Sequence, residues 1–198
     1  MISHCGRDLN KEWLAYMENQ NLASQTEFRI KIMDMAIQIL DALVLLHKVG
    51  FCHWDLKLDN ICFSEGRYYL IDFAFSQRIN PEHNRKITEF KGNSMFASIR
   101  KFQINPKAAP IDDIESLFYL VAFCLDGFYL PWLQDYINQD STEQFIYNRL
   151  KKASKSHQYL YEQMPRELAK GLRYIHRMSE KINSNEINAS GGSVLRDT

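Results

Sequence analysis

One long apolar segment limits what this chain can fold into more than any other feature of its sequence. Residues 28–47 include no glycine or proline, and apolar side chains cover most faces of the helix that they would form. The expected buried stripe comprises Ile32, Met33, Ala36, Ile37, Leu40, Leu43, Val44 and His47. We therefore expect a buried helix that stops near Gly50 and forms the spine of the domain.

Beyond this helix the apolar pattern changes, first to that of strands and then back to that of helices. Two short β-prone runs, 61–63 and 68–71, flank the turn-forming residues 64–67 and predict a β-hairpin. Further helices are expected at about 8–20, 111–125, 143–152 and 166–178. The predicted fold class is mainly α with one small β-hairpin.

The composition is that of an ordinary globular protein. The 198 residues are enough for one domain with a hydrophobic core, and 24 Lys and Arg residues balance 24 Asp and Glu residues. This balance gives no general attraction to nucleic acid or to a membrane, and no apolar run is long enough to span a bilayer. We expect an intracellular protein, cytoplasmic or nuclear, in which residues 181–198 form a disordered polar tail.

Four polar residues flank the predicted hairpin, where its fold would bring them together. Asp55, Lys57 and Asn60 precede the first strand, and Asp72 follows the second. Phosphoryl transfer uses such a set, because a carboxylate orients the acceptor hydroxyl, a cation neutralises the moving phosphoryl group and oxygen ligands hold Mg²⁺. The sequence therefore predicts a phosphotransferase site at the base of the hairpin.

The same residues follow a known motif. The pattern H-x-D-x-K-x-x-N at 53–60, with Asp72 and Phe73 after the hairpin, resembles the catalytic and metal-binding loops of eukaryotic protein kinases. The resemblance implies that Asp55 is the catalytic base and that Lys57 contacts the transferred phosphate.

The resemblance also implies cofactors and a partner. It assigns His53 to the support of the loop and Asn60 and Asp72 to the binding of Mg²⁺, with ATP as the phosphoryl donor. Lys57, two residues after the aspartate, is typical of kinases that act on serine and threonine. The expected partner is thus a protein substrate with a Ser or Thr acceptor hydroxyl.

Three further segments narrow the resemblance to the casein kinase 1 family. They are 92–99, similar to G-T-A-R-Y-A-S-I, 112–119, similar to D-D-L-E-S-L-G-Y, and the L-P-W at 130–132. By this resemblance residues 1–180 form a kinase C-terminal lobe, or C-lobe, that starts at the hinge. The residues expected to contact the adenine of ATP are Ile2, Ser3 and Cys5 in the hinge and Cys62 in the pocket floor.

The sequence departs from the family in several places. No G-x-G-x-x-G loop and no strand lysine precede the hinge, so the parts of the N-lobe that cover ATP are absent from these 198 residues. Trp54 replaces the usual arginine of H-R-D, Ala74 replaces the glycine of D-F-G, and Met95 replaces an arginine. We expect the chain to be inactive alone, with an uncovered surface that self-associates or binds a partner.

Three functions stay open at this point. The chain is a casein kinase 1-like kinase represented by a fragment or truncated form, or a degenerate pseudokinase that acts as a binding or scaffold module. A small-molecule phosphotransferase shares H-x-D-x-x-x-x-N and I-D-F, but Lys57 and the block at 113–116 argue against that class. Retention of the polar catalytic residues favours the first alternative, because a binding module has no chemical need for them.

Overall fold

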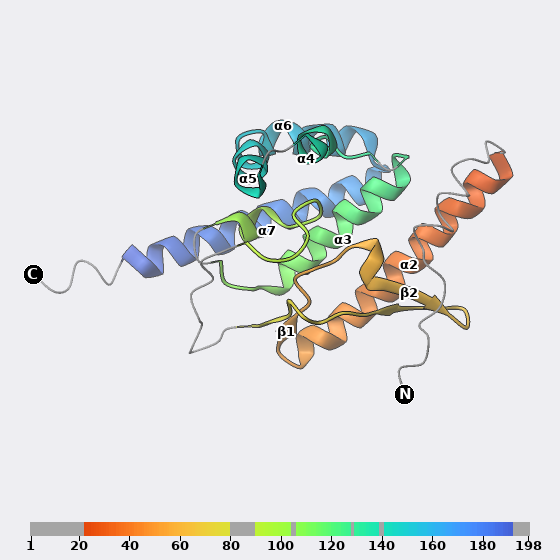
Figure 1. Ribbon diagram of the computed structural model, residues 1–198, viewed down its shortest axis with the longest axis horizontal. Helices are drawn as coiled ribbons and strands as arrows, with labels where there is room; N and C mark the ends of the chain where they lie inside the picture. The colour runs from red at the N-terminus through yellow and green to blue at the C-terminus, as the bar shows by residue number, and fades with distance from the viewer. Residues whose placement is uncertain (1–21, 80–89, 104–105, 128, 139–140, 192–198) are drawn as a thin grey trace, which may run out of the picture.

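The computed structural model describes residues 22–79, 90–103, 106–127, 129–138 and 141–191 (Figure 1). The predicted helix at 8–20 and the hinge residues Ile2, Ser3 and Cys5 lie outside this part of the chain. The described fold is mainly α-helical with two small antiparallel β-ladders, which confirms the predicted class. Within the same ranges, no helix combines the length and the apolar character that crossing a bilayer requires.

Helix α2, Leu22–Lys48, confirms the predicted spine but buries a face partly different from the one expected. The side chains that face the core are Phe28, Ile32, Met35, Ala36, Ile39 and Leu43. Ile37, Leu40 and Val44 of the predicted stripe are exposed instead. Because apolar residues occur on most faces of this helix, its periodicity does not show which face the rest of the chain covers.

The predicted β-hairpin is present. Strand β2, Ile61–Ser64, pairs antiparallel with β3, Arg67–Leu70, so that Ile61 lies opposite Leu70. Glu65 and Gly66 connect them with positive φ angles of 51° and 78°, the geometry of a two-residue turn that matches the twist of the strands. The hairpin packs against α2 through β3.

A second ladder, which the sequence analysis does not predict, closes the segment around the hairpin. Strand β1, Phe51–Cys52, pairs with β4, Gln77–Arg78. The two strands bracket residues 53–76, which include both polar segments and the hairpin between them. Strands of two residues are too short to show a period of two, so the pattern carries no signal for them.

Helix α3, Pro110–Leu125, confirms the predicted apolar helix and occupies the centre of the molecule. It packs against α2 on one side and against α7 on the other (Figure 1). Its first turn is polar yet buried, because Asp113 bonds to the backbone of His53 and Trp54 and Asp112 bonds to Ser98 and Arg100.

The remaining helices build a layer beyond α7. Helix α5, Thr142–Lys151, matches the helix predicted at 143–152, whereas α4, Leu133–Ile137, and α6, Ala153–Gln163, are additional. A short 3₁₀ helix η2, Ile99–Phe102, contacts both α3 and α5. Helix α6 packs on α7, so α4, α5 and α6 form a layer beside that helix (Figure 1).

Helix α7, Arg166–Gly191, is longer than the predicted helix at 166–178 and corrects the predicted boundary at residue 181. The tail expected at 181–198 is helical through Gly191, and residues 192–198 lie outside the described part of the chain. A tertiary contact holds this part of the helix, since Arg100 Nη1 donates a hydrogen bond to Asn183 Oδ1 at 2.6 Å. The polar segment 181–191 is therefore a helical extension of α7.

Candidate active site

Asp113 of α3 holds the backbone at the start of segment 53–60. Its carboxylate accepts hydrogen bonds from the backbone N–H of His53 at 2.7 Å and of Trp54 at 2.8 Å. Trp54 has a φ of 66°, a left-handed conformation that bulky side chains rarely adopt. The two charge-assisted bonds offset the cost of this conformation and fix the direction in which the next residue, Asp55, points.

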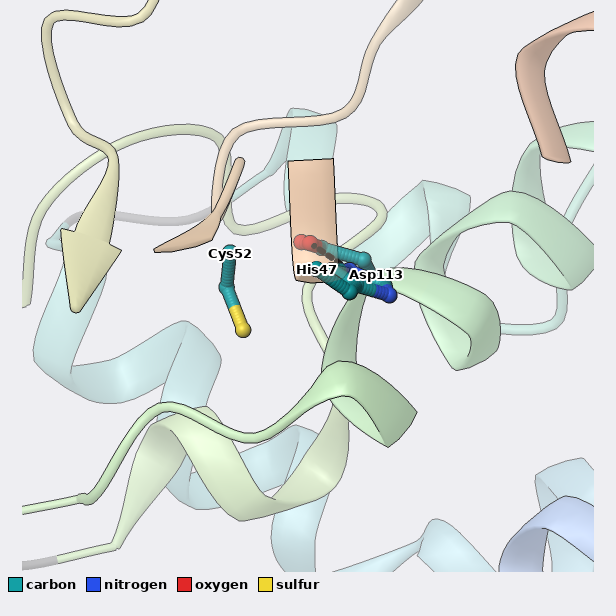
Figure 2. Close-up of side chains that lie close together, drawn as sticks. All are labelled: His47, Cys52 and Asp113. Atoms are coloured by element: carbon teal, nitrogen blue, oxygen red, sulfur yellow. Dashed lines mark hydrogen bonds and ion pairs between the residues drawn. The ribbon is translucent and has the colours of Figure 1, made fainter. Parts of the chain in front are cut away.

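His47, Cys52 and Asp113 lie close enough together to raise the question of a metal site (Figure 2). Asp113 Oδ2 also accepts a hydrogen bond from His47 Nε2 at 2.8 Å, so its oxygens are already used by three donors. Burial raises the pKa of the Cys52 thiol, and the carboxylate of Asp113 raises it further, which disfavours the thiolate that a metal needs. This group is a hydrogen-bonded junction between α2, α3 and segment 53–60.

Asp55 is buried at the centre of the site, with 2% of its surface exposed. Asn60 Nδ2 donates to its Oδ2 at 3.0 Å and to its backbone carbonyl at 2.7 Å, which closes the loop 55–60 on itself. The backbone N–H of Asn93 donates to its Oδ1 at 2.5 Å, and Lys57 Nζ lies 3.6 Å from its Oδ2. The structure thus brings Asp55, Lys57 and Asn60 together as predicted.

Gly92 presses directly against Asp55. Its φ is +86°, and a Cβ added there would lie 2.6 Å from Asp55 Oδ1. This approach brings the backbone N–H of the next residue, Asn93, to the carboxylate. In the sequence Gly92 stands out only as part of a motif, although a glycine is an ordinary signal of a close backbone approach such as this one.

Lys101 of η2 contacts Trp54, and the sequence gives no signal of this contact either. Its Nζ donates a hydrogen bond to the carbonyl oxygen of Trp54 and lies 5.2 Å from the centre of the Trp54 ring and 4.9 Å from that of Phe90. Burial lowers the pKa of Lys101 to about 8, against the opposing effect of the Asp55 carboxylate. A buried cation therefore stands behind the loop at the position where Trp54 has replaced an arginine.

The segment after the hairpin returns beside segment 53–60. The backbone N–H of Ile71 donates to the carbonyl of Asn60 at 2.9 Å, and His53 Nε2 donates to the carbonyl of Ile71 at 3.0 Å. His53 is buried and also meets the edge of the Phe73 ring, with 5.2 Å between the ring centres. His53 therefore joins the two polar segments, and its role in supporting the loop stays a prediction.

Asp72 lies in the same turn with its side chain exposed. Its φ is 60°, and its Oδ1 accepts a hydrogen bond from the backbone N–H of Ala74 at 3.2 Å. Ala74, which stands where the motif has glycine, has no positive φ in the described chain, and the left-handed residue of this turn is Asp72. Aspartate tolerates this conformation because its side chain bonds to nearby backbone, as it does here.

Cys62 is buried in β2, opposite Tyr69 on the neighbouring strand. Its predicted place in the floor of an adenine pocket stays a prediction, because the hinge residues that would form the other walls lie outside the described part of the chain.

Comparison with known proteins decides the family. The sequence matches the family model "Protein kinase domain" over residues 8–112, a range that includes the hairpin and both polar segments. The chain belongs to the protein kinase domain family. The matched range contains His53, Asp55, Lys57, Asn60 and Asp72.

Individual protein kinases match over shorter ranges. A protein named casein kinase I homologue from Encephalitozoon cuniculi is 31% identical over 102 residues, which are 49% of this chain and 32% of that protein. A protein named casein kinase I from Caenorhabditis elegans is 34% identical over 108 residues, 50% of this chain and 31% of that protein. The serine/threonine-protein kinase ste20 of Aspergillus oryzae is 36% identical over 80 residues, 38% of this chain and 9% of that protein.

These matches cover a part of each relative. The chain aligns with about a third of the length of the two proteins named casein kinase I. The activity, substrates and partners of a whole kinase are therefore proposals for this chain.

Proposed function

We propose that this chain is the C-lobe of a serine/threonine protein kinase similar to casein kinase 1, and that its site transfers the γ-phosphate of ATP to a Ser or Thr hydroxyl of a protein. The observation that carries the proposal is the arrangement around Asp55. A buried carboxylate, held by Asn60 and the backbone of Asn93, lies 3.6 Å from the ammonium group of Lys57. This arrangement joins a base to a cation, which phosphoryl transfer to a hydroxyl requires.

Each residue has a role that its position supports. Asp55 orients the acceptor hydroxyl and takes up its proton, while Lys57, which is partly exposed, neutralises charge on the phosphoryl group. The protein substrate contributes the hydroxyl and contacts the open side of this pair.

The oxygen ligands of the site fit Mg²⁺. Asn60 uses its amide nitrogen for both bonds to Asp55, which leaves its Oδ1 for a cation, and the exposed carboxylate of Asp72 stands in the adjacent turn. Amide and carboxylate oxygens suit a hard cation of this kind. Mg²⁺ bound by them would neutralise the phosphates of ATP, whose adenine would lie against Cys62 and the hinge residues Ile2, Ser3 and Cys5.

The ATP phosphates need a cover that these 198 residues do not supply, because the sequence contains no glycine-rich loop and no strand lysine before the hinge. We therefore propose that the chain alone is inactive and that it acts together with an N-lobe. The surface for such a partner includes Phe73, whose side chain is 50% exposed, and Tyr69, which is 44% exposed. Without that partner the same surface promotes self-association.

A pseudokinase that serves as a binding module is the second candidate. Both carboxylate oxygens of Asp55 are occupied by protein donors, and the site carries Trp54 and Ala74 at positions where the kinase motifs have arginine and glycine. Donors on both oxygens compete with the acceptor hydroxyl of a substrate for the Asp55 carboxylate. This candidate therefore predicts that no addition restores phosphoryl transfer.

A fusion experiment separates the two candidates. The full chain is joined behind the N-lobe of a casein kinase I relative, and transfer of radiolabelled phosphate to casein is measured with Mg²⁺ and ATP. We expect the fusion to phosphorylate casein and the same fusion with Asp55→Asn to lose at least about a hundredfold of that activity, the usual contribution of a positioned base. The chain without an N-lobe should transfer no more phosphate than its own Asp55→Asn variant.

Two other outcomes would contradict the proposal. A folded fusion that binds ATP but transfers no phosphate supports the pseudokinase. Activity of the chain by itself that disappears in Asp55→Asn would show that the N-lobe is dispensable.

A further inference from the structure

We propose that the exposed side of helix α7 is a docking surface for an acidic segment of a partner protein. Five cationic side chains form a single row on this side, which we name the basic row: Arg166, Lys170, Arg173, Arg177 and Lys181. All five are exposed, and they belong to a helix that contributes no residue to the site around Asp55. The proposal therefore stands independently of phosphoryl transfer.

The spacing of these residues along the helix produces the row. Successive members are three or four positions apart, so all five fall within a sector of about 80° and extend over about 22 Å of helix. The opposite side of α7 is buried, with Ala169, Leu172 and Ile175 in the core. Helices α3 and α6 pack against α7 (Figure 1), and the basic row stays exposed beside them.

The described part of the chain does little to neutralise the basic row. Glu167 Oε1 lies 2.9 Å from Lys170 Nζ, and this is the one ion pair that the row makes among the described residues. Arg173 lies over the ring of Tyr161, 4.7 Å from its centre, which packs the side chain without supplying a negative charge. The equal numbers of acidic and basic residues in the whole sequence therefore conceal a local excess of positive charge.

The basic row breaks two local rules of helix stability. Arg173 and Arg177 are four positions apart, as are Arg177 and Lys181, and like charges at this spacing repel each other along a helix. Arg166 is the first residue of α7, where the helix dipole disfavours a cation. Local choices that cost stability without a compensating contact are typical of functional surfaces. An anionic partner along the row would remove both penalties.

The surroundings of the row favour an acidic protein segment over a nucleic acid or a membrane. Exposed carboxylates, Glu167 and Glu180, border the row, so it suits a narrow chain whose own carboxylates match the cations and not a broad anionic surface. The neutral balance of the whole chain gives no long-range attraction to a polyanion. Within the described side chains of α7, Tyr174 is the one large apolar residue that is exposed, whereas a membrane-bound helix inserts a whole apolar face.

The chemistry of the row also sets how such a partner is recognised. Exposed ion pairs are individually weak and are screened by salt, so affinity arises only when several carboxylates meet the row together. Arginine side chains form two parallel hydrogen bonds with a carboxylate, which rewards a partner whose acids are correctly spaced. Binding should therefore depend on the spacing of the acidic residues as well as on their number, and it should weaken as salt is added.

A synthetic helical peptide provides the first test. Its glutamates repeat the spacing of the basic row, and a control peptide of the same composition distributes them around the helix. Fluorescence anisotropy measures the binding of each labelled peptide to the full chain at low salt. We expect the matched peptide to bind at least about fivefold more tightly than the control and to be released by added salt. Equal affinities overturn the proposal, and so does tighter binding of single-stranded RNA or of vesicles that contain phosphatidylserine.

Charge-reversal variants locate the binding surface. Arg166 and Arg177 make no hydrogen bond, ion pair or ring contact within the described residues, so Arg166→Glu combined with Arg177→Glu leaves the packing intact. We expect this double variant to raise the dissociation constant of the matched peptide at least about tenfold.

The same double variant should raise the thermal midpoint of the free chain, because it removes the repulsion along α7 and places an acid at the start of the helix. A loss of binding then does not come from unfolding. The control combines Lys151→Glu with Lys155→Glu, two exposed positions on α5 and α6 that change the net charge equally, and it should alter the dissociation constant by less than about twofold. Unchanged affinity in the α7 variant, or an equal loss in the control, would refute the assignment.

Discussion

The backbone N–H of Asn93 donates a hydrogen bond to the carboxylate of Asp55 at 2.5 Å across 38 positions of the chain. This contact joins the segment after α2 to the segment before η2 and brings the backbone of Gly92 close to Asp55. It explains why Asp55 is buried although it belongs to a polar loop, and it makes the geometry of the site depend on a glycine that has no side chain.

Replacing Gly92 should therefore damage the site more than replacing a glycine of the same backbone conformation. We expect Gly66→Ala, where φ is +78° and no atom lies within 4 Å of the added Cβ, to lower the free energy of unfolding by about 1 kcal/mol. Gly92→Ala pays the same backbone cost and adds a clash with Asp55 at 2.6 Å, so its loss should be at least about twice as large. Urea unfolding of both variants measures the difference, and equal losses would mean that the loop moves freely.

Lys101 should make stability depend on pH in the alkaline range. Its pKa is about 8 in the folded chain and 10.5 for an ordinary lysine, so between these values the unfolded chain binds more protons. The free energy of unfolding should then rise as pH increases from 8 to 10.5, by up to about 3 kcal/mol. The comparison is with Lys101→Met, which removes this titration, and parallel pH profiles for the two proteins would contradict the prediction.

Substitution by methionine should lower the free energy of unfolding by different amounts at two buried arginines. Arg100 bonds to Asp112 at 3.2 Å and to the carbonyl of Lys107 at 3.1 Å, so Arg100→Met leaves a buried carboxylate unpaired and should cost about 3–5 kcal/mol. Arg149 stacks on Trp132, and its guanidinium has no hydrogen-bond partner within the described residues. Arg149 still acts through its charge on the buried carboxylate of Glu115, so Arg149→Met should lower stability, but by less than Arg100→Met. Calorimetry that ranks the two losses the other way would contradict this account.

The exposed aromatic surface at the hairpin should control self-association. We expect the purified chain to form oligomers in light scattering and Phe73→Ser to raise the dissociation constant of the oligomer by at least about tenfold. Tyr174→Ser is the control, because Tyr174 is similarly exposed, at 58%, but lies on α7. Oligomers that dissociate in the Tyr174 variant and persist in the Phe73 variant would place the interface elsewhere.

Hydrophobic periodicity and turn residues predict those parts of the fold that depend on residues close together in the sequence. The spine helix, the hairpin and α3 are confirmed because their periodicity extends over many residues or ends in residues of definite turn preference, such as Gly66. The ladder between β1 and β4 and the short helix α4 are too brief to carry such a pattern. The prediction of the buried face of α2 was wrong in part, because only the packing of other elements selects among its several apolar faces.

Residue types and their spacing were enough to indicate which residues make the site chemically possible. Asp55, Lys57, Asn60 and Asp72 could be selected because their types and spacing match what phosphoryl transfer needs, and the motif carries this information without any structure. Only the tertiary structure decided how they are held. Asp113 fixes the backbone of Trp54, Gly92 brings the backbone of Asn93 to Asp55, and Lys101 places a cation behind the loop. These contacts join residues 38–59 positions apart, and no local pattern encodes them because they arise when separate elements pack and bury their polar groups together.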